Sequence, residues 1–264
     1  MKLSFKNLCS PAFFLAILCS SIAFTQFQEV QRLSRDYSSV QDYHLSDAQL
    51  AVTKSVPSVG FQNIVANWSF IQFLQYFGDD EVRNRVGYGD SAKYLSVAIH
   101  HDPYFRELYV FLSGSSTIFA GKPKDTVRVM SEGIAQIGER RAPDSYYIWR
   151  YKGTDELLFL NDSQSAQKSF ETAAQWAAQS DDVNGSLMSQ LSTQTAQFLS
   201  NNPDSSLAQI NAWGSILTTA LNEETRQRAV AKIRELGGDV FVTDAGQIQI
   251  EYSKSENHPN GSQI

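Results

Sequence analysis

The chain has 264 residues, of which 42% are hydrophobic, 12% aromatic and 19% charged, and its formal net charge is −6. It is long enough to bury a sizeable core in one large or two small domains. It contains no run of five basic residues, which argues against a nucleic-acid partner. Both cysteines, Cys9 and Cys19, lie in the apolar N-terminal segment, which excludes disulfide and thiolate chemistry from the rest of the chain.

Residues 1–28 have the pattern of a targeting segment. Lys2 and Lys6 precede an apolar run from Pro11 to Phe24. This pattern fits a secretory signal peptide cleaved after Ala23, and it also fits an uncleaved membrane anchor. A buried core helix is a further alternative. The basic start favours an orientation in which the bulk of the chain lies on the non-cytoplasmic side, periplasmic or lumenal.

Residues 29–57 form a polar stretch with an intermittent helical spacing of apolar residues. The pattern predicts either a marginal helical stalk or a loosely ordered linker. Pro57 and Gly60 mark its end, and the region predicted to carry the helical repeats, residues 58–238, follows.

The segment Phe61–Phe77 is the most apolar stretch of this region. Large apolar side chains cover most of its circumference at helical spacing, so we expect a helix that is buried on most sides. One stripe consists of Ile64, Trp68, Ile71 and Leu74 or Gln75, and the next consists of Val65, Ser69, Phe73 and Phe77. The next stretch, Asp79–Asp90, is expected to be a charged loop.

Further helices follow at short intervals, separated by Pro, Gly and Asn-rich turns. The segments predicted to be helical are Ser91–His101, Tyr104–Phe119, Asp125–Ile137, two helices within Tyr146–Ala178, Ser186–Ser200, Ser206–Leu221 and Glu223–Leu236. Gly114 predicts a close helix crossing, and Gly133 is expected to face inward.

The periodicity of the apolar residues changes from 3.6 to 2 after Gly238, and residues 239–252 therefore predict a small β-hairpin. The polar tail, residues 253–264, is expected to be disordered. The predicted fold class is therefore all-α, built of helix-pair repeats, with a small C-terminal β-hairpin.

Three of the helix pairs share an arrangement of small and aromatic residues in their second helix. The arrangement is clearest at Ala166, Phe170 and Ala173, and it resembles the small–x3–aromatic–x2–small pattern of the tetratricopeptide repeat (TPR). The interval from Thr126 to Ala166 is 40 residues, longer than the roughly 34 of that family. The first-helix signature of the family is mostly absent.

The chain as a whole also resembles membrane-anchored, TPR-like proteins of unassigned function from cyanobacteria. The stretches that carry this resemblance are Asn67–Asp80, His101–Phe105 and Tyr146–Leu160. The resemblance implies a TPR-like α-solenoid over about residues 58–180, in which the first helices of successive pairs line a groove that binds peptides or helices.

The first helix of the Tyr146–Ala178 pair is rich in polar and aromatic side chains. The candidate partner-binding residues are Trp149, Arg150, Lys152, Asp155 and Glu156. Lys152 and Glu156 are i,i+4 neighbours and can form an ion pair. One interpretation is a groove that faces a partner; the other is a salt-bridged surface around a core tryptophan.

The sequence offers few residues for metal or cofactor chemistry. His100 and His101 are adjacent on a helix, so their side chains diverge and chelate one metal ion poorly, whereas cations at a helix C-terminus are favourable. No nucleotide-binding, zinc-binding or nucleophile motif occurs. We therefore expect no metal and no cofactor.

Three functional hypotheses remain open. The first is a non-catalytic scaffold that binds a protein partner and is held at a membrane by its N-terminal segment. The second is a hydrolase or carbohydrate-acting α/α enzyme that uses loop carboxylates at Asp79–Glu81 with Asp155 or Glu156, which requires these acids to converge in a pocket. The third is a periplasmic small-ligand binder with one deep aromatic pocket.

Overall fold

The computed structural model describes residues 17–18, 20–28, 47–55, 60–139, 141–201, 203–220, 222–243 and 248–252. The predicted tail, most of the predicted linker and the tip of the predicted hairpin lie outside these ranges. The chain divides into two units, Met1–Tyr43 and His44–Ile264. In the first unit, residues 17–18 and 20–28 are helical and their apolar side chains are exposed. Among the described residues, no helix combines the length and apolar character that a membrane span requires.

The second unit is almost entirely helical, which confirms the predicted fold class. Its helices are α2 (Asp47–Ser55), α3 (Gln62–Gly78), α4 (Asp80–Val86), α5 (Ser91–His101), α6 (Glu107–Leu112), the π-helical segment η3 (Ser113–Phe119), α7 (Pro123–Ile137), α8 (Tyr146–Leu158), α9 (Ser163–Ala178), α10 (Gly185–Ser200), α11 (Ser206–Thr219) and α12 (Glu223–Glu235). The strands β1 (Gly238–Val242) and β2 (Ile248–Tyr252) form an antiparallel pair in which Val240 is opposite Ile250.

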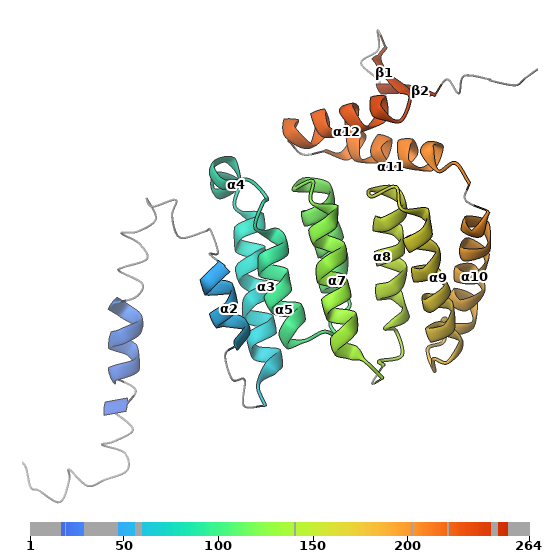
Figure 1. Ribbon diagram of the computed structural model, residues 1–264. Coiled ribbons are helices and arrows are strands. Elements are labelled where there is room, and N and C mark those ends of the chain that lie inside the picture. The colour runs from blue at the N-terminus through green and yellow to red at the C-terminus, as the bar shows by residue number, and fades with distance from the viewer. Residues whose placement is uncertain are drawn as a thin grey trace, which may run out of the picture. The chain divides into compact units, whose positions relative to one another are not determined.

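Most of these helices stand side by side in one row. Figure 1 shows α3, α5, α7, α8, α9 and α10 in sequence order, with α11 and α12 lying across one end of the row. Each helix of the row packs against the next, and α11 also packs against α8. Neighbours in sequence are therefore neighbours in space, as in a stack of helix pairs.

Small residues allow the helices of this row to approach closely. Ala166 and Ala173 of α9 are fully buried, as the sequence predicts. A Cβ atom at Gly133 of α7 would overlap Tyr109 Oη of α6 and would lie 2.7 Å from Ile99 Cγ2 of α5. Gly133 therefore faces inward, as expected, at the point where α5, α6 and α7 meet.

The prediction of a close crossing at Gly114 is wrong. This residue lies in η3, and a Cβ atom added to it would meet nothing within 4 Å. The predicted helix Tyr104–Phe119 is also not continuous α-helix, because the α-helical part begins at Glu107 and gives way to η3 at Ser113.

The segment predicted to be a charged loop is largely helical, and part of residues 29–57, predicted to be either a helical stalk or a loosely ordered linker, is helical as well. Asp80 and Glu81 begin α4, and Arg83 and Arg85 end it, so its charges complement the helix dipole and pair one turn apart. The last part of the predicted linker forms α2, which packs on α5. The backbone carbonyl of Thr53 lies 3.1 Å from His101 Nε2, so α2 is attached to the row.

The C-terminal helices form their own core with the hairpin. Trp213 and Ile233 are buried there, and Ile250 and Tyr252 of β2 pack against them. Trp213 also meets Phe159, just after α8, edge to face with ring centroids 5.3 Å apart. The hairpin thus packs on the last helices, because an isolated two-stranded sheet is marginal in water.

Candidate functional site

The five residues predicted to bind a partner all lie on α8, but they are not a surface cluster. Asp155 is 0% exposed and Glu156 is 3% exposed, while Trp149, Arg150 and Lys152 are half-buried. A buried carboxylate is costly unless hydrogen bonds or an ion pair satisfy it, and both carboxylates here have such partners.

Asp155 joins α8 to η3. Ser113 Oγ donates to Asp155 Oδ2 and Thr117 Oγ1 donates to Asp155 Oδ1, each at 2.6 Å. Burial raises the pKa of Asp155 to about 6, the two hydroxyl hydrogen bonds act in the opposite direction, and the nearby Glu156 raises the pKa further. No part of the Asp155 side chain is accessible to a ligand.

Glu156 and Lys152 form the predicted i,i+4 ion pair, with Lys152 Nζ 2.5 Å from Glu156 Oε1. Ser169 of α9 completes the arrangement, because its hydroxyl donates to Glu156 Oε2 at 2.6 Å and accepts from Lys152 Nζ at 3.1 Å. This pair therefore holds α8 to α9 from the inside.

Arg150 and Trp149 extend the same pattern of contacts. Arg150 Nη1 donates to Ser192 Oγ of α10 at 2.6 Å, and its guanidinium packs on the Phe170 ring. Trp149 meets Trp176 of α9 edge to face, at 5.9 Å between ring centroids. The five predicted residues together connect α8 to its neighbouring helices. Their role in this structure is to stabilise the row.

The burial of α3 differs most from what the sequence predicts, and this difference reveals an exposed apolar surface away from the five residues of α8. Only one side of this helix is buried, at Ala66, Ser69, Phe73 and Tyr76. One of the two stripes expected to be buried is exposed: Trp68 is 61% accessible, and Ile64, Ile71 and Leu74 are exposed with it, as is Phe61 just before the helix. The other stripe is buried at Phe73 and half-buried at Val65 and Phe77, as predicted. The helix contains no charged residue.

Exposed apolar side chains also occur on α6 and just before it. Tyr104, Val110 and Phe111 are all at least 40% accessible. Phe70 of α3 connects the two helices, with its ring centroid 5.2 Å from that of Phe111. Isolated exposed apolar residues are ordinary, whereas several on neighbouring helices make a candidate binding surface.

The N-terminal end of α8 lies beside these residues. The Arg106 guanidinium lies 5.2 Å from the centroid of the Tyr147 ring, and Arg106 also pairs with Asp144 at 3.2 Å. Tyr147 and Tyr151 stack one turn apart. We call the surface made of the exposed residues Phe61, Ile64, Trp68, Ile71, Leu74, Tyr104, Val110 and Phe111, together with Tyr147, the aromatic face.

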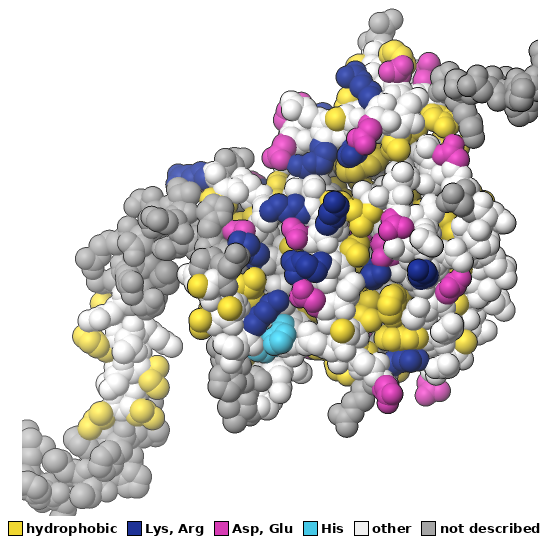
Figure 2. All heavy atoms as spheres, viewed as in Figure 1, with side chains coloured by type: hydrophobic (Ala, Val, Ile, Leu, Met, Phe, Trp, Pro, Cys, Tyr) yellow, Lys and Arg dark blue, Asp and Glu magenta, His cyan; other side chains and the backbone are white. Residues whose placement is uncertain are grey.

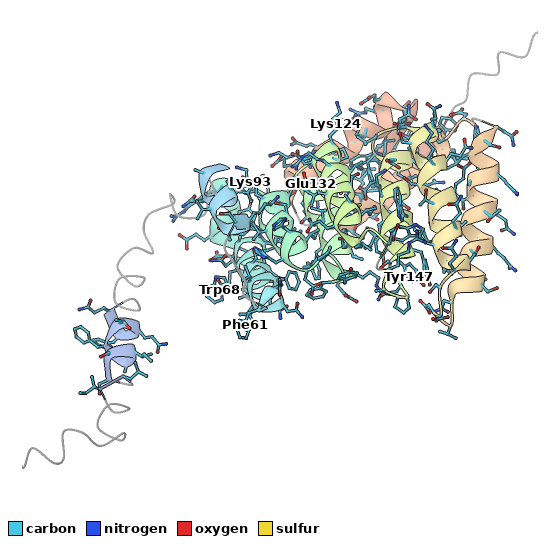
Figure 3. All side chains as sticks on the ribbon, turned by 60° about the horizontal axis from the view of Figure 1, so that its bottom comes forward. Phe61, Trp68, Lys93, Lys124, Glu132 and Tyr147 are labelled. Carbon is cyan, nitrogen blue, oxygen red and sulfur yellow. The ribbon has the colours of Figure 1, made fainter. Side chains whose placement is uncertain are left out.

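The other side of the row has a different character. Figure 3 shows Phe61, Trp68 and Tyr147 along one side of the molecule and Lys93, Lys124 and Glu132 along the other. In Figure 2 basic and acidic side chains are interspersed over α5 and α7. Arg128 and Glu132 of α7, for example, pair at 2.7 Å. The row therefore has one apolar, aromatic side and one charged side.

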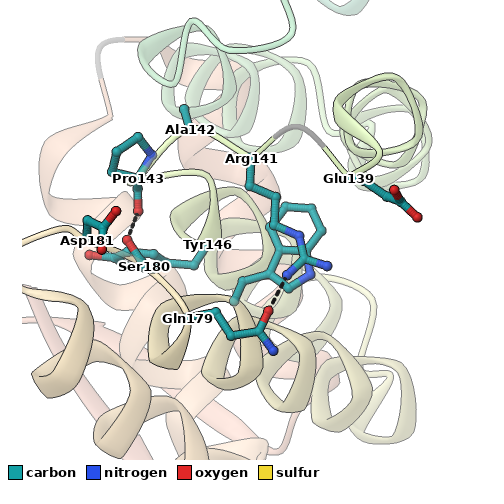
Figure 4. A pocket seen from close by; sticks show the side chains of 9 residues that line it. Glu139, Arg141, Ala142, Pro143, Tyr146, Gln179, Ser180 and Asp181 are labelled. Carbon is teal, nitrogen blue, oxygen red and sulfur yellow. Dashed lines mark hydrogen bonds between the residues drawn. The ribbon is translucent and has the colours of Figure 1, made fainter.

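A polar cavity of about 390 Å³ lies between the loop that precedes α8 and the end of α9. Figure 4 shows Arg141 beside Gln179, to which its guanidinium donates at 2.9 Å. The same guanidinium lies 4.4 Å from the centroid of the Trp176 ring. Arg141 thus connects the loop before α8 to the end of α9.

The acids proposed for hydrolysis do not converge in a described cavity. Asp80 and Glu81 are largely exposed on α4, whereas Asp155 and Glu156 are buried against η3 and α9. None of them lines the cavity beside Arg141 or the cavity beside Lys124. The described residues include no group of three or more His, Cys, Asp or Glu that could hold a metal ion.

Comparisons with protein families, curated proteins and solved structures found no match to this chain. The repeat family suggested by the sequence therefore remains a prediction, and the site has to be argued from its own residues.

Proposed function

We propose that this chain is a non-catalytic scaffold that binds a protein partner through its aromatic face and is tethered at, or exported across, a membrane by its N-terminal segment. The observation that carries the proposal is the exposure of Trp68 at 61% on a helix without charges. Aromatic residues dominate the energetics of protein interfaces, and charged residues are depleted at their centres.

The composition of the aromatic face fits a protein partner. Amide side chains, including Asn67 and Gln75, lie among its apolar residues and can hydrogen-bond a partner's backbone. Arg106, Glu107 and Asp144 supply charge at one edge, where the rim of an interface is typically polar. An amphipathic helix or an extended apolar segment would match this combination.

The same proposal assigns the row of helix pairs to the TPR type. In that family the first helices of successive pairs carry the binding surface. In this proposal α3, α6 and α8, which precede α5, α7 and α9 in the chain, are those first helices. The sequence of residues 1–28 supports the membrane part of the proposal, through its basic start and apolar run.

The proposal can be tested by affinity purification. The full chain, tagged at its C-terminus, is purified from the membranes of cells that produce it. Trp68→Ser combined with Val110→Ser removes two exposed members of the aromatic face. The matched control is Lys168→Ser combined with Glu171→Ser, which changes two exposed residues of α9. We expect the partner to bind the first variant about thirtyfold more weakly, the usual effect of removing an interface hot spot.

The control variant should recover the same partner as the unaltered chain. Equal recovery with the Trp68→Ser, Val110→Ser variant would contradict the proposal. The intact mass of the purified chain distinguishes an uncleaved anchor from a cleaved signal peptide. The chain retains residues 1–23 if the segment is an anchor and lacks them if the segment is cleaved after Ala23.

A further inference from the structure

A second cavity, of about 490 Å³, lies where the end of the row meets the C-terminal helices. Its wall includes the N-terminus of α7, the residues after α8, and parts of α11 and α12. The aromatic face does not contribute to it. Figure 3 shows Lys124, which lines this cavity, on the opposite side of the molecule from Phe61, Trp68 and Tyr147.

The charged side chains that line the cavity are mostly basic. They are Lys122, Lys124, Arg228 and Lys232, with Asp125 as the single carboxylate. Asp125 is close to another cation, because its carboxylate lies 3.5 Å from Arg128. The wall of the cavity therefore carries an excess of positive charge.

Two of these cations are not neutralised by a carboxylate. Lys122 Nζ donates to the backbone carbonyl of Gly89 at 2.9 Å, which leaves its charge uncompensated. No described residue forms an ion pair or a side-chain hydrogen bond with Lys124. Both lie at the N-terminus of α7, where no side chain caps the first amides and the helix dipole adds to the positive potential.

The other two cations have carboxylate partners. Arg228 pairs with Glu224 and Lys232 pairs with Glu235, each at 2.7 Å. Both glutamates are more than 60% exposed, so water screens these pairs and they contribute little. Arg228 and Lys232 can therefore still attract an anion across the cavity.

The remaining wall of the cavity is apolar. Trp213 and Phe159, which meet edge to face, contribute to it together with Leu160 and Pro123. A cavity with apolar walls and a few charged groups is the usual form of a small-molecule site.

We propose that this cavity binds a small organic anion, a carboxylate or phosphate carried on a flat apolar body. The anionic group would lie at Lys122 and Lys124, and the apolar body against Phe159, Leu160 and Trp213. The site is separate from the aromatic face, so a regulatory ligand could occupy it while a protein partner is bound.

Calorimetric titration of the full chain in a non-ionic detergent tests the site. The probes are 2-naphthoate, phenyl phosphate, the neutral analogue 2-naphthamide and inorganic phosphate. We expect one of the two organic acids to bind at a single site with a Kd below about 1 mM. It should bind about tenfold more tightly than 2-naphthamide, because one charge-assisted hydrogen bond contributes about this much to affinity.

Two variants locate the binding. Lys122→Gln combined with Lys124→Gln removes the uncompensated charges, and Leu160→Trp fills the apolar end without changing charge. Each should weaken binding of the organic acid about tenfold or more. Lys168→Gln, which removes an exposed charge from α9, is the control and should leave binding unchanged.

The outcomes are distinct. Binding that is lost in both site variants and kept in the control supports the site. Equal binding of 2-naphthoate and 2-naphthamide, or unchanged binding in the site variants, would overturn it, as would inorganic phosphate binding as tightly as the organic acids. Failure of both acids to bind below about 1 mM would also overturn it.

Discussion

The Thr117 hydroxyl of η3 donates a 2.6 Å hydrogen bond to the carboxylate of Asp155 on α8, inside the protein. Asp155 thus connects α8 to η3. Its carboxylate has a raised pKa of about 6 against an ordinary value of 3.8, principally because it is buried. The burial of this carboxylate makes the stability of the row sensitive to pH.

Asp155→Asn should remove this sensitivity. A carboxyl whose pKa is raised by folding stabilises the folded state fully at low pH, and this contribution is lost as the pH rises through the folded pKa. The free energy of unfolding of the unaltered chain, relative to that of the Asp155→Asn variant, should therefore fall by about 2.5 kcal/mol between pH 4 and pH 7. Denaturant unfolding at several pH values measures this difference. Asp181→Asn, at an exposed position, controls for the loss of one charge.

Gly133→Ala should destabilise the protein although alanine is the better helix former. The added methyl group would overlap Tyr109 Oη and lie 2.7 Å from Ile99 Cγ2, so α5, α6 and α7 would have to move apart. Overpacking of this kind costs about 1–3 kcal/mol. Gly114→Ala is the matched control, because its methyl group meets nothing within 4 Å and should be neutral or stabilising by up to about 1 kcal/mol. Equal effects of the two changes in denaturant unfolding would contradict this packing.

Lys152 and Glu156 should behave as a coupled pair in a double-mutant cycle. Lys152→Met leaves the Glu156 carboxylate buried without its cation and should cost about 3–5 kcal/mol of unfolding free energy. Adding Glu156→Leu removes that buried charge, so the double variant should lose less than the sum of the two single losses. Strict additivity would show that the pair does not interact in solution.

Arg228 should hold α12 against the end of η3. Its Nη1 atom donates to the carbonyls of Ile118 and Phe119, at 2.9 and 2.8 Å. Arg228→Ala should therefore accelerate amide hydrogen exchange in α11 and α12 by about tenfold or more, because hydrogen bonds from a charged group are worth about 1.5–3 kcal/mol. The control is Arg226→Ala, which removes an exposed partner of Glu223 and should change the exchange little. Similar exchange in both variants would argue against this attachment.

The sequence was sufficient to predict most of the helices and their order, although α4 lies where a loop was expected. Apolar spacing, turn residues and small residues such as Ala166 and Ala173 are local signals, and the structure agrees with them. The ion pair between Lys152 and Glu156 was also predictable, because its spacing lies within one helix.

Sequence reasoning could not predict which side of a helix meets another helix. Trp68 and Ile71 are as apolar as Phe73, but only Phe73 lies toward α5 and α6. The amides at Asn67 and Gln75 were the one local sign that this side of α3 is exposed. The burial of Asp155 was equally hidden, because its partners Ser113 and Thr117 lie about 40 residues earlier in the chain.

Site-specific photo-crosslinking tests the role of the aromatic face most directly. A photoreactive phenylalanine analogue placed at Trp68 or Tyr104 in the full chain, in the membranes of cells that make it, would lie on the aromatic face. The same analogue at Lys93 or Glu132 would lie on the charged side and serves as the control.

The account predicts that Trp68 and Tyr104 crosslink to one and the same protein, and that Lys93 and Glu132 do not. Crosslinks only within the chain itself, or equal crosslinking from both sides of the row, would contradict it.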